Sequence, residues 1–312
     1  MSTATTEAAR RREPRDPTRP TWSEWPAVFK RAAKRFVKDD CTGLSQQVAF
    51  GALLAFLPTV ILLIGLLGLL GTGVFDSLEH FVGSVAPQGV VSIIDTAKND
   101  AARSKSGSAI ALAVGAVAAL WAASGAMGAV VKAVNRAYGR RETRPFWKVR
   151  LVSLVLVFAT GIVLAGTFLL IVFGGNLGDA IARRTPLDGG FTLFWNIARW
   201  PIAFTAVLLF FSLVYSLAPN VEQRSWRWVS PGSLVGSLMW LALSGLFALY
   251  TSYSSSYDRT YGSLAGAIIL LLWLNYSAWA ILFGAELNGE LDRRKLARAD
   301  HGETAVQGSV RV

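Results

Sequence analysis

The last long apolar segment of the chain, residues 263–285, and the residues just after it carry polar groups at a regular spacing. Asn275, Trp279, Leu282 and Glu286 follow one another at intervals of four, three and four residues, which places their side chains on one face of an α-helix. Ionisable groups inside a membrane face a bundle interior or a wet cavity, because lipid cannot solvate them. This face is typical of a polar pathway for a solute or of a site for a lipid headgroup.

A purely structural interpretation fits the same residues. Glu286 follows the apolar segment directly, where it could pair with Arg136 or Lys132 or cap backbone groups. Asn275 could form a hydrogen bond between two helices. Because Asn275 lies nearer the middle of the segment, it is the better marker of any pathway. Glu286 and Asn288 at its end are candidates for an inner gate or for structural pairing.

Polar residues of other segments are candidates to meet this face. They are Gln46, Gln47, Ser124, Lys132, Asn135 and Arg136. In the predicted topology the cations among them lie on the inner side of the membrane. There they would attract an anionic substrate.

Two enzyme classes can be tested against the composition. A zinc-dependent phosphodiesterase needs several histidines and carboxylates around its metals, and this chain has only His80 and His301. A Ser/His/Asp hydrolase fails on the same shortage. Asp39 and Asp40 are adjacent carboxylates, but they precede a predicted helix, where N-capping accounts for them. We therefore expect a protein that is not an enzyme and that uses no metal and no cofactor.

The chain as a whole is too apolar to be a soluble globule. Hydrophobic residues make up 53% of it and charged residues 16%, against roughly 25% charged residues in ordinary soluble domains. About 20 apolar residues in a helix cross the hydrocarbon layer of a bilayer. The sequence predicts an all-α, polytopic membrane protein with six transmembrane helices. The predicted spans are residues 48–74, 108–131, 151–173, 201–217, 231–250 and 263–285.

Proline and glycine residues modify these spans. Pro58 lies inside the first span and predicts a kinked or discontinuous helix. Two GxxxG pairs, Gly232 with Gly236 and Gly262 with Gly266, open the fifth and sixth spans. Such pairs let a neighbouring backbone approach closely, so we expect helix packing at these positions.

The segments around the spans differ in character. Residues 1–21 are polar and Arg-rich and predict a disordered, basic cytoplasmic tail. Residues 22–38 predict an amphipathic helix in the plane of the headgroups, and the alternative is a helix docked on other parts of the protein. Residues 39–291 then form the six-helix membrane domain, in which residues 75–107 predict short helices on the outside. Residues 292–312 predict a cytoplasmic tail.

The basic residues predict the orientation of the chain. It has 31 Lys and Arg and a formal net charge of +11, and most of these cations lie before the first span, between the second and third, or after the last. Positive charge in short loops marks the cytoplasmic side, so both termini are expected there. Topology thus accounts for the charge, and we expect no nucleic-acid partner. The expected partners are membrane lipids, with anionic lipid at the cytoplasmic face.

Several short motifs resemble, by their order and spacing, the YihY/BrkB family of bacterial inner-membrane proteins over residues 39–291. The motifs are Asp40, Val48-Ala49-Phe50 with Phe56-Leu57-Pro58, Asn135 with Ala137 and Tyr138, Arg144 with Phe146 and Trp147, Pro219-Asn220, Pro231-Gly232, Trp240, Tyr250, Tyr261-Gly262, Trp273-Leu274, and Gly284-Ala285-Glu286-Leu287-Asn288. The Gln46-Gln47 pair and the Arg-rich N-terminus depart from the family pattern.

The resemblance implies one six-helix domain, multi-pass, in the bacterial cytoplasmic (inner) membrane. Members of the family carry ribonuclease or serum-resistance labels, and transport of a lipid or small solute is a suggestion made for the group. The hypothesis that the residues favour is a transporter or exporter of a lipid or another amphiphilic, anionic molecule. The alternatives are a non-transporting membrane scaffold and a tRNA-processing ribonuclease, which the lack of a catalytic cluster disfavours.

Overall fold

The computed structural model describes residues 20–70, 108–172, 190–221, 229–253 and 265–309. All the regular structure in these ranges is helical, which confirms the all-α prediction. The elements are the short 3-10 helix η1 (Trp22–Glu24) and the helices α2 (Trp25–Lys38), α3 (Cys41–Leu70), α6 (Ser108–Ala137), α7 (Phe146–Val172), α9 (Gly190–Leu217), α10 (Pro231–Tyr253) and α12 (Ala265–Ser309).

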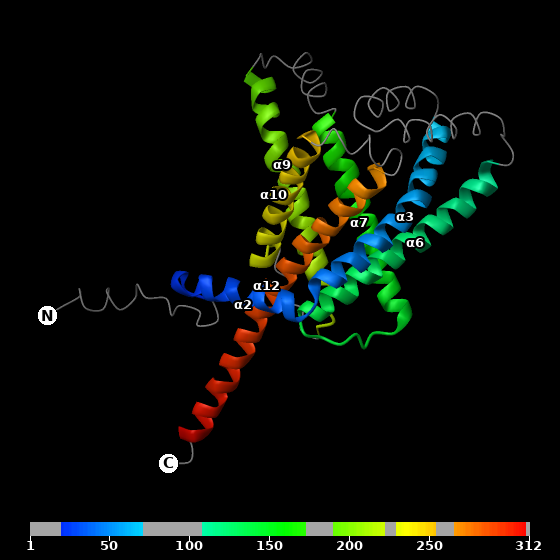
Figure 1. Cartoon of the computed structure of the whole chain (residues 1–312). Helices are drawn as coiled ribbons and strands as arrows, with labels where there is room; N and C mark the ends of the chain where they lie inside the picture. Colours follow the sequence, from blue (N-terminus) through cyan, green and yellow to red (C-terminus); the bar gives the residue numbers. More distant parts are fainter. Residues whose placement is uncertain (1–19, 71–107, 173–189, 222–228, 254–264, 310–312) are drawn as a thin grey trace.

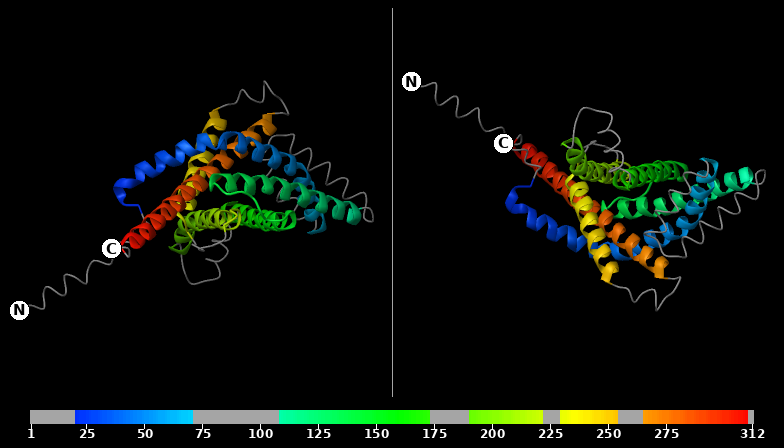
Figure 2. Two further views of the ribbon diagram at one scale, coloured as in Figure 1. Left: turned by 90° about the horizontal axis from the view of Figure 1, so that it is seen from below. Right: turned by 90° about the horizontal axis from the view of Figure 1, so that it is seen from above.

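The six long helices form a bundle in which consecutive helices pack side by side. Each helix contacts the next one along the chain, in the order α3, α6, α7, α9, α10 and α12. The last helix, α12, also packs on α3, so that these contacts close a ring (Figures 1 and 2). α12 also contacts α6 and α2. α6, α7, α9, α10 and α12 each contain a segment long and apolar enough to cross a membrane, and α3 is apolar as well. The chain is a multi-pass membrane protein.

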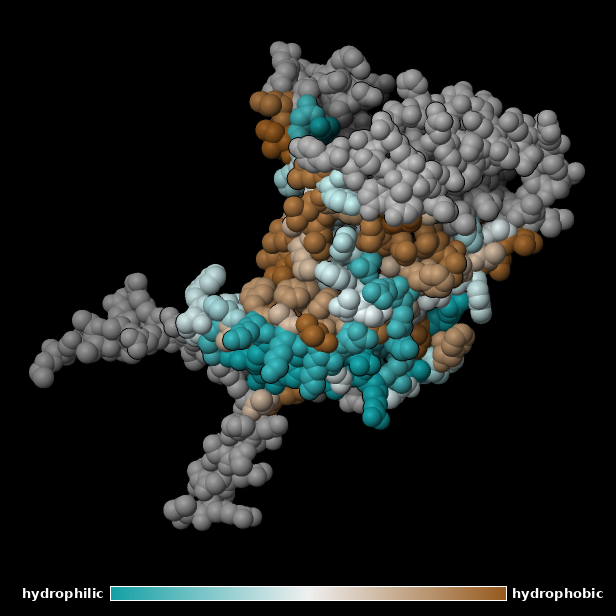
Figure 3. Space-filling model, in the orientation of Figure 1, coloured by the Kyte–Doolittle hydropathy of each residue, from teal (hydrophilic) through white to brown (hydrophobic). Residues whose placement is uncertain are grey.

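One end of this bundle is polar. We call it the polar end and define it by helix α2, the connection 137–146 and the segment 286–295 of α12. In Figure 3 hydrophilic side chains form a band across this end, and the surface above the band is hydrophobic. Helix α2 runs across the bundle at this level rather than along it (Figure 1).

Side-chain packing is concentrated toward the polar end. The main core cluster draws on the first turns of α3, the last turns of α6 and α9 and the middle of α12, with members such as Val134, Val214 and Leu282. Toward the opposite end, Val117 of α6 and Leu246 of α10 are 69% and 63% exposed. In Figure 1 the helices diverge in this direction.

The predicted helix at residues 22–38 is present as η1 and α2. It packs on α12 through Val28 and Ala32, which form a small cluster with Leu287 and Leu291. The inner face of α2 is therefore docked on another part of the protein, as in the alternative prediction. Its outer face keeps exposed cations, and its placement among the headgroups stays a prediction.

Several details of the helices differ from the predictions. α3 continues through Pro58 as one helix, so of the two predicted alternatives the discontinuous helix is wrong. α9 begins at Gly190 and contains Pro201, because the apolar, aromatic residues before this proline extend the helix. α12 continues to Ser309, through the segment predicted as a tail. The predicted outside helices at 75–107 lie beyond the described residues, as does most of the N-terminal tail.

Candidate functional site

Glu286 is completely buried at the polar end, between α12 and the first turn of α3. Its Oε1 accepts a hydrogen bond from the thiol of Cys41 at 3.6 Å. Its Oε2 lies 3.6 Å from Nη2 of Arg293, an ion pair too long to be a hydrogen bond. Oε2 has no hydrogen-bond partner among the described residues. A buried carboxylate with an open acceptor is costly to keep, so Glu286 is the leading candidate for a functional group here.

Glu290, one helical turn after Glu286, lies at the centre of an arginine network. Nε of Arg31 lies 2.6 Å and Nε of Arg35 3.4 Å from its two oxygens. Nε of Arg293 lies 3.7 Å from Oε2. Since Arg31 and Arg35 belong to α2, this one carboxylate joins α2 to α12.

A second ion pair ties the start of α2 to the same helix. Nη2 of Arg294 donates to Oε1 of Glu24 at 2.7 Å. The backbone N–H of Thr21 donates to Oε2 of Glu24 at 2.9 Å. The hydrogen bond from Thr21, assisted by the hydrogen bond and charge of Arg294, lowers the pKa of Glu24 against the opposing effect of desolvation. Glu24 is therefore held as a carboxylate at neutral pH.

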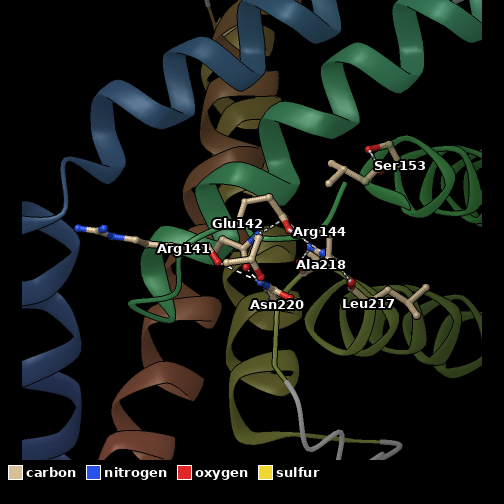
Figure 4. Close-up of polar contacts among 10 residues, drawn as sticks. Arg141, Glu142, Arg144, Ser153, Leu217, Ala218 and Asn220 are labelled. Carbon is tan, nitrogen blue, oxygen red and sulfur yellow. Dashed lines mark hydrogen bonds and ion pairs between the residues drawn. The ribbon is translucent and has the colours of Figure 1, made fainter. Parts of the chain in front are cut away.

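A polar clamp fixes the connection between α6 and α7 to the end of α9 (Figure 4). Nε and Nη2 of Arg144 donate to the two carboxylate oxygens of Glu142 at 2.8 and 2.7 Å. The same guanidinium donates to the carbonyl groups of Leu217 and Ala218 at 3.2 and 2.7 Å. Arg144 thus caps the C-terminus of α9, where carbonyl groups lack helical partners.

Asn135 completes the clamp from α6. Its Nδ2 donates to Oε2 of Glu142 at 2.8 Å, and its Oδ1 accepts the backbone N–H of Asn220 at 2.7 Å. The side chain of Asn220 donates to the carbonyl of Arg141 and to the hydroxyl of Thr143. Both polar atoms of the Asn135 side chain have a partner, so the clamp is a structural unit.

The contacts of this clamp lower the pKa of Glu142. The hydrogen bonds from the Arg144 side chain lower it most, and desolvation by burial opposes them. The backbone N–H of Arg144 and the side chain of Asn135 lower it further. The clamp therefore binds its carboxylate in the ionised form.

The predicted face of α12 has open polar atoms in its middle. Oδ1 of Asn275 and Nε1 of Trp279 are buried and have no hydrogen-bond partner in the parts of the chain that the structure describes. The ring of Trp279 contacts Phe36 of α2 and Tyr276 of its own helix. Each polar residue of the predicted face, Glu286 included, thus carries one unsatisfied buried atom.

The other candidates are placed as follows. Gln46, Gln47, Lys132 and Arg136 are exposed. Ser124 is buried and donates to the carbonyl of Trp121 at 3.0 Å in its own helix. These residues do not gather around Glu286.

The partners predicted for Glu286 need a correction. The structure pairs this carboxylate with Arg293 of its own helix and not with Arg136 or Lys132, because those two side chains point to the surface.

The side chain of Asn288 forms hydrogen bonds with the start of the neighbouring helix α10. Its Oδ1 accepts the backbone N–H of Gly232 and its Nδ2 donates to Oγ of Ser230, both at 2.9 Å. It thus caps the N-terminus of α10. Gly266 is described and half-buried, whereas Gly262 lies outside the described residues.

Three residues beside Glu286, namely Cys41, Glu290 and Arg293, were not predicted from the sequence. Glu290 and Arg293 continue the spacing of Glu286 by four and three residues, so the same helical face extended past the apolar segment would have found them. Cys41 has no such signal, because the contact depends on how α3 meets α12. Among the described residues no group of His, Cys, Asp and Glu could hold a metal ion.

Comparison with known proteins gives a consistent set of relatives. A family model described as virulence factor BrkB matches residues 32–308. A Bacillus subtilis protein named putative ribonuclease-like protein YfkH is 32% identical over 86% of this chain and 96% of its own length. UPF0761 membrane proteins of Alteromonas mediterranea and Alkalilimnicola ehrlichii are 25% and 26% identical over 89% and 90% of this chain, and over 92% and 62% of their own lengths. No solved structure is significantly similar.

Proposed function

The chain belongs to the BrkB family of multi-pass membrane proteins, and from this premise we propose that it transports or exports an amphiphilic, anionic molecule such as a lipid across the bacterial cytoplasmic membrane. Both termini lie on the cytoplasmic side in this proposal, because the basic segments cluster at the polar end. The observation that carries it is the row of open polar atoms on α12, at Asn275, Trp279 and Glu286.

Open polar atoms of this kind are costly in an apolar bundle. An unsatisfied buried group costs about 1–3 kcal/mol, and a scaffold would lose this stability without gain. A solute that passes along α12 would satisfy Oδ1 of Asn275 and Nε1 of Trp279 in turn. The splayed packing away from the polar end supports access from that side, while the packed core closes the polar end.

Charge at the polar end favours an anionic substrate. Arg31 and Arg35 are 47% and 37% exposed while they bind Glu290. Lys132 and Arg136 add exposed cations at the end of α6. Such a rim concentrates anions and anionic lipid at the polar end of a pathway along α12.

We also propose that the protein is not an enzyme. The name of the Bacillus subtilis relative contains the word ribonuclease-like, but the two histidines of this chain are too few for a metal-dependent nuclease. His301 lies on the last turns of α12, and His80 lies outside the described residues. RNA breakdown by the purified protein, lost on Glu286→Gln substitution, would overturn this part of the proposal.

The transport proposal is tested with the purified protein in lipid vesicles. We expect fluorescent phosphatidylglycerol to cross the bilayer faster than in empty vesicles, and Asn275→Leu to slow this movement. Ala267→Ser is the control, because it changes the polarity of an exposed position on the same helix, and it should leave the rate unaltered. Movement no faster than in empty vesicles, with several lipid classes and an ion gradient, would favour the scaffold.

A further inference from the structure

Helix α2 carries two sets of cations with different surroundings. Lys30, Lys34 and Lys38 are exposed. Arg31 and Arg35, one helical turn apart, bind Glu290 of α12 but keep 47% and 37% of their side-chain surface exposed. The two arginines are therefore accessible from outside while they hold α2 on α12.

Glu290 has more cationic partners than it can bind closely. Three guanidinium groups surround its carboxylate, and their distances are 2.6 Å for Arg31, 3.4 Å for Arg35 and 3.7 Å for Arg293. Of these three contacts, the one with Arg31 has the distance and geometry of a hydrogen bond. The side chain of Glu290 is only 7% exposed, so bulk water cannot replace a cationic partner that the carboxylate loses.

Arg293 is a reserve partner for this carboxylate. Its Nε and Nη2 are buried and have no hydrogen-bond partner in the described ranges, although they lie 3.7 and 3.6 Å from Glu290 and Glu286. A small side-chain shift would bring these donors into hydrogen-bond range. Glu290 can therefore lose Arg31 and Arg35 and remain paired.

The position of α2 suggests what could take these arginines. The helix lies across the bundle within the hydrophilic band, directly below the hydrophobic surface (Figures 1 and 3). The headgroups of a bilayer that surrounds the apolar surface would lie at this level. Trp22, 92% exposed next to α2, is a residue type that favours the membrane interface.

We infer that Arg31 and Arg35 form a binding site for the phosphate of an anionic lipid headgroup, and that this phosphate competes with Glu290 for the two guanidinium groups. Arginine suits this role because its planar fork binds phosphate and carboxylate in the same way. The lysines on the outer face of α2 add attraction for the anionic surface. The inference rests on the proposed contact of the polar end with anionic lipid, but not on transport.

Lipid binding would loosen α2 from α12. The remaining ties are the Arg294–Glu24 pair and the contacts of Val28 and Ala32. Phe36 of α2 packs against the core cluster that contains Cys41. When α2 moves, the first turn of α3 becomes accessible, and with it the thiol of Cys41.

Cys41 provides the measurement, because it is the single cysteine of the chain and is fully buried. The full-length protein is placed in nanodiscs of phosphatidylcholine, with or without an equal amount of phosphatidylglycerol, and the rate of modification by N-ethylmaleimide is followed by mass spectrometry. We expect the rate to rise roughly twofold or more with the anionic lipid, as a shift toward the open population. Inorganic phosphate added to the phosphatidylcholine nanodiscs separates a free phosphate from a lipid headgroup.

Charge-matched variants decide the assignment. Arg31→Gln with Arg35→Gln should give fast modification in both nanodiscs, with no lipid dependence. Lys30→Gln with Lys34→Gln removes the same charge from residues that do not contact Glu290 in the described structure, and should keep the lipid dependence. If the glutamine variant does not fold, Arg31→Lys with Arg35→Lys is used instead. It keeps the positive charge but lacks the planar guanidinium group, so it should weaken the lipid dependence if two-pronged binding of the phosphate matters.

Three results would overturn the inference or part of it. The first is an equal rate for the unaltered protein in both nanodiscs. The second is loss of the lipid dependence in the Lys30 and Lys34 variant, which would show general surface attraction instead of a site. The third is a response to inorganic phosphate equal to that of phosphatidylglycerol, which would overturn the assignment to a lipid headgroup. Failure of the vesicle transport assay alone would overturn the proposed function and leave this site standing.

Discussion

Gly232 of α10 and Gly284 of α12 pack backbone against backbone. A Cβ atom added to Gly284 would lie 2.5 Å from the carbonyl oxygen of Gly232, and one added to Gly232 would meet the carbonyl oxygen of Gly284. The Asn288 side chain, which caps α10, lies against Gly232 as well. This close approach sets the distance between the two helices at the polar end.

Replacement of Gly232 by alanine should destabilise the protein. The added methyl group would overlap with Gly284 and Asn288, and overpacking of this kind costs about 1–3 kcal/mol. We expect a lower midpoint of thermal unfolding in detergent, measured by circular dichroism.

Gly245 on the same helix provides the control for this substitution. No atom of the described structure lies within 4 Å of a Cβ atom added there, and alanine is favoured over glycine inside a helix by roughly 0.5–1 kcal/mol. Gly245→Ala should leave stability unchanged or raise it. Equal effects of the two substitutions would contradict the close packing of α10 on α12.

The architecture was readable from the sequence because it rests on local patterns. Six apolar segments predict six long helices, and the alternation of aromatic and basic residues predicts α2. The GxxxG pair Gly232 and Gly236 predicts close packing, and added Cβ atoms at both positions would meet neighbouring helices. The ends of the helices were less predictable, since Pro201 and the apolar residues before it act in opposite directions on α9.

The partners within the candidate site were not readable in the same way. Asn275 and Glu286 were found from their spacing on one helix. That Glu286 meets Cys41, or that Asn135 meets Glu142 and Asn220, depends on the relative position of helices, which no local pattern encodes. The spacing therefore predicts which residues share a face of one helix, but not which residues of other segments they contact.

The clamp between Glu142 and Arg144 should make stability depend on acid pH. The folded-state pKa of Glu142 lies below its ordinary value, about 4.3 in the unfolded chain. The contribution to stability is therefore present above this ordinary value and is lost as the pH falls through the lowered folded-state pKa. We expect Glu142→Gln to destabilise the protein at neutral pH and to remove this part of the acid sensitivity, measured by unfolding in detergent from neutral to acid pH.

Asp292 is a suitable control for the clamp. It lies 3.7 Å from Lys295 on the part of α12 beyond the core, and exposed pairs contribute about 0–1 kcal/mol. Asp292→Asn should therefore change neither the neutral stability nor the acid profile appreciably. If Glu142→Gln behaves in the same way, Arg144 does not hold α9 through this carboxylate.

Asn275→Leu should separate function from stability. The substitution removes an unsatisfied buried oxygen, and loss of such an atom without loss of volume is neutral or stabilising. We expect an unchanged or higher unfolding temperature together with slower lipid movement in vesicles. A marked fall in stability would instead indicate that Asn275 forms a structural hydrogen bond between helices.

The buried pair of Glu286 and Arg293 should respond unequally to removal of its two members. Arg293 faces both Glu286 and Glu290, so Arg293→Gln leaves Glu286 buried without its cation. Breaking a buried pair in this way costs about 3–5 kcal/mol. Glu286→Gln should cost less, because Arg293 retains Glu290 and the amide oxygen can still accept from Cys41.

The double variant completes this test. In the variant that lacks the carboxylate of Glu286, removal of Arg293 takes a cationic partner from Glu290 alone. Glu290 keeps its ion pairs with Arg31 and Arg35. The combined loss of stability should therefore be smaller than the sum of the two single losses, by about 0.5–3 kcal/mol for residues in contact. Unfolding by guanidinium in detergent measures all three variants. Strictly additive losses would show that the 3.6 Å contact between Glu286 and Arg293 carries no coupling.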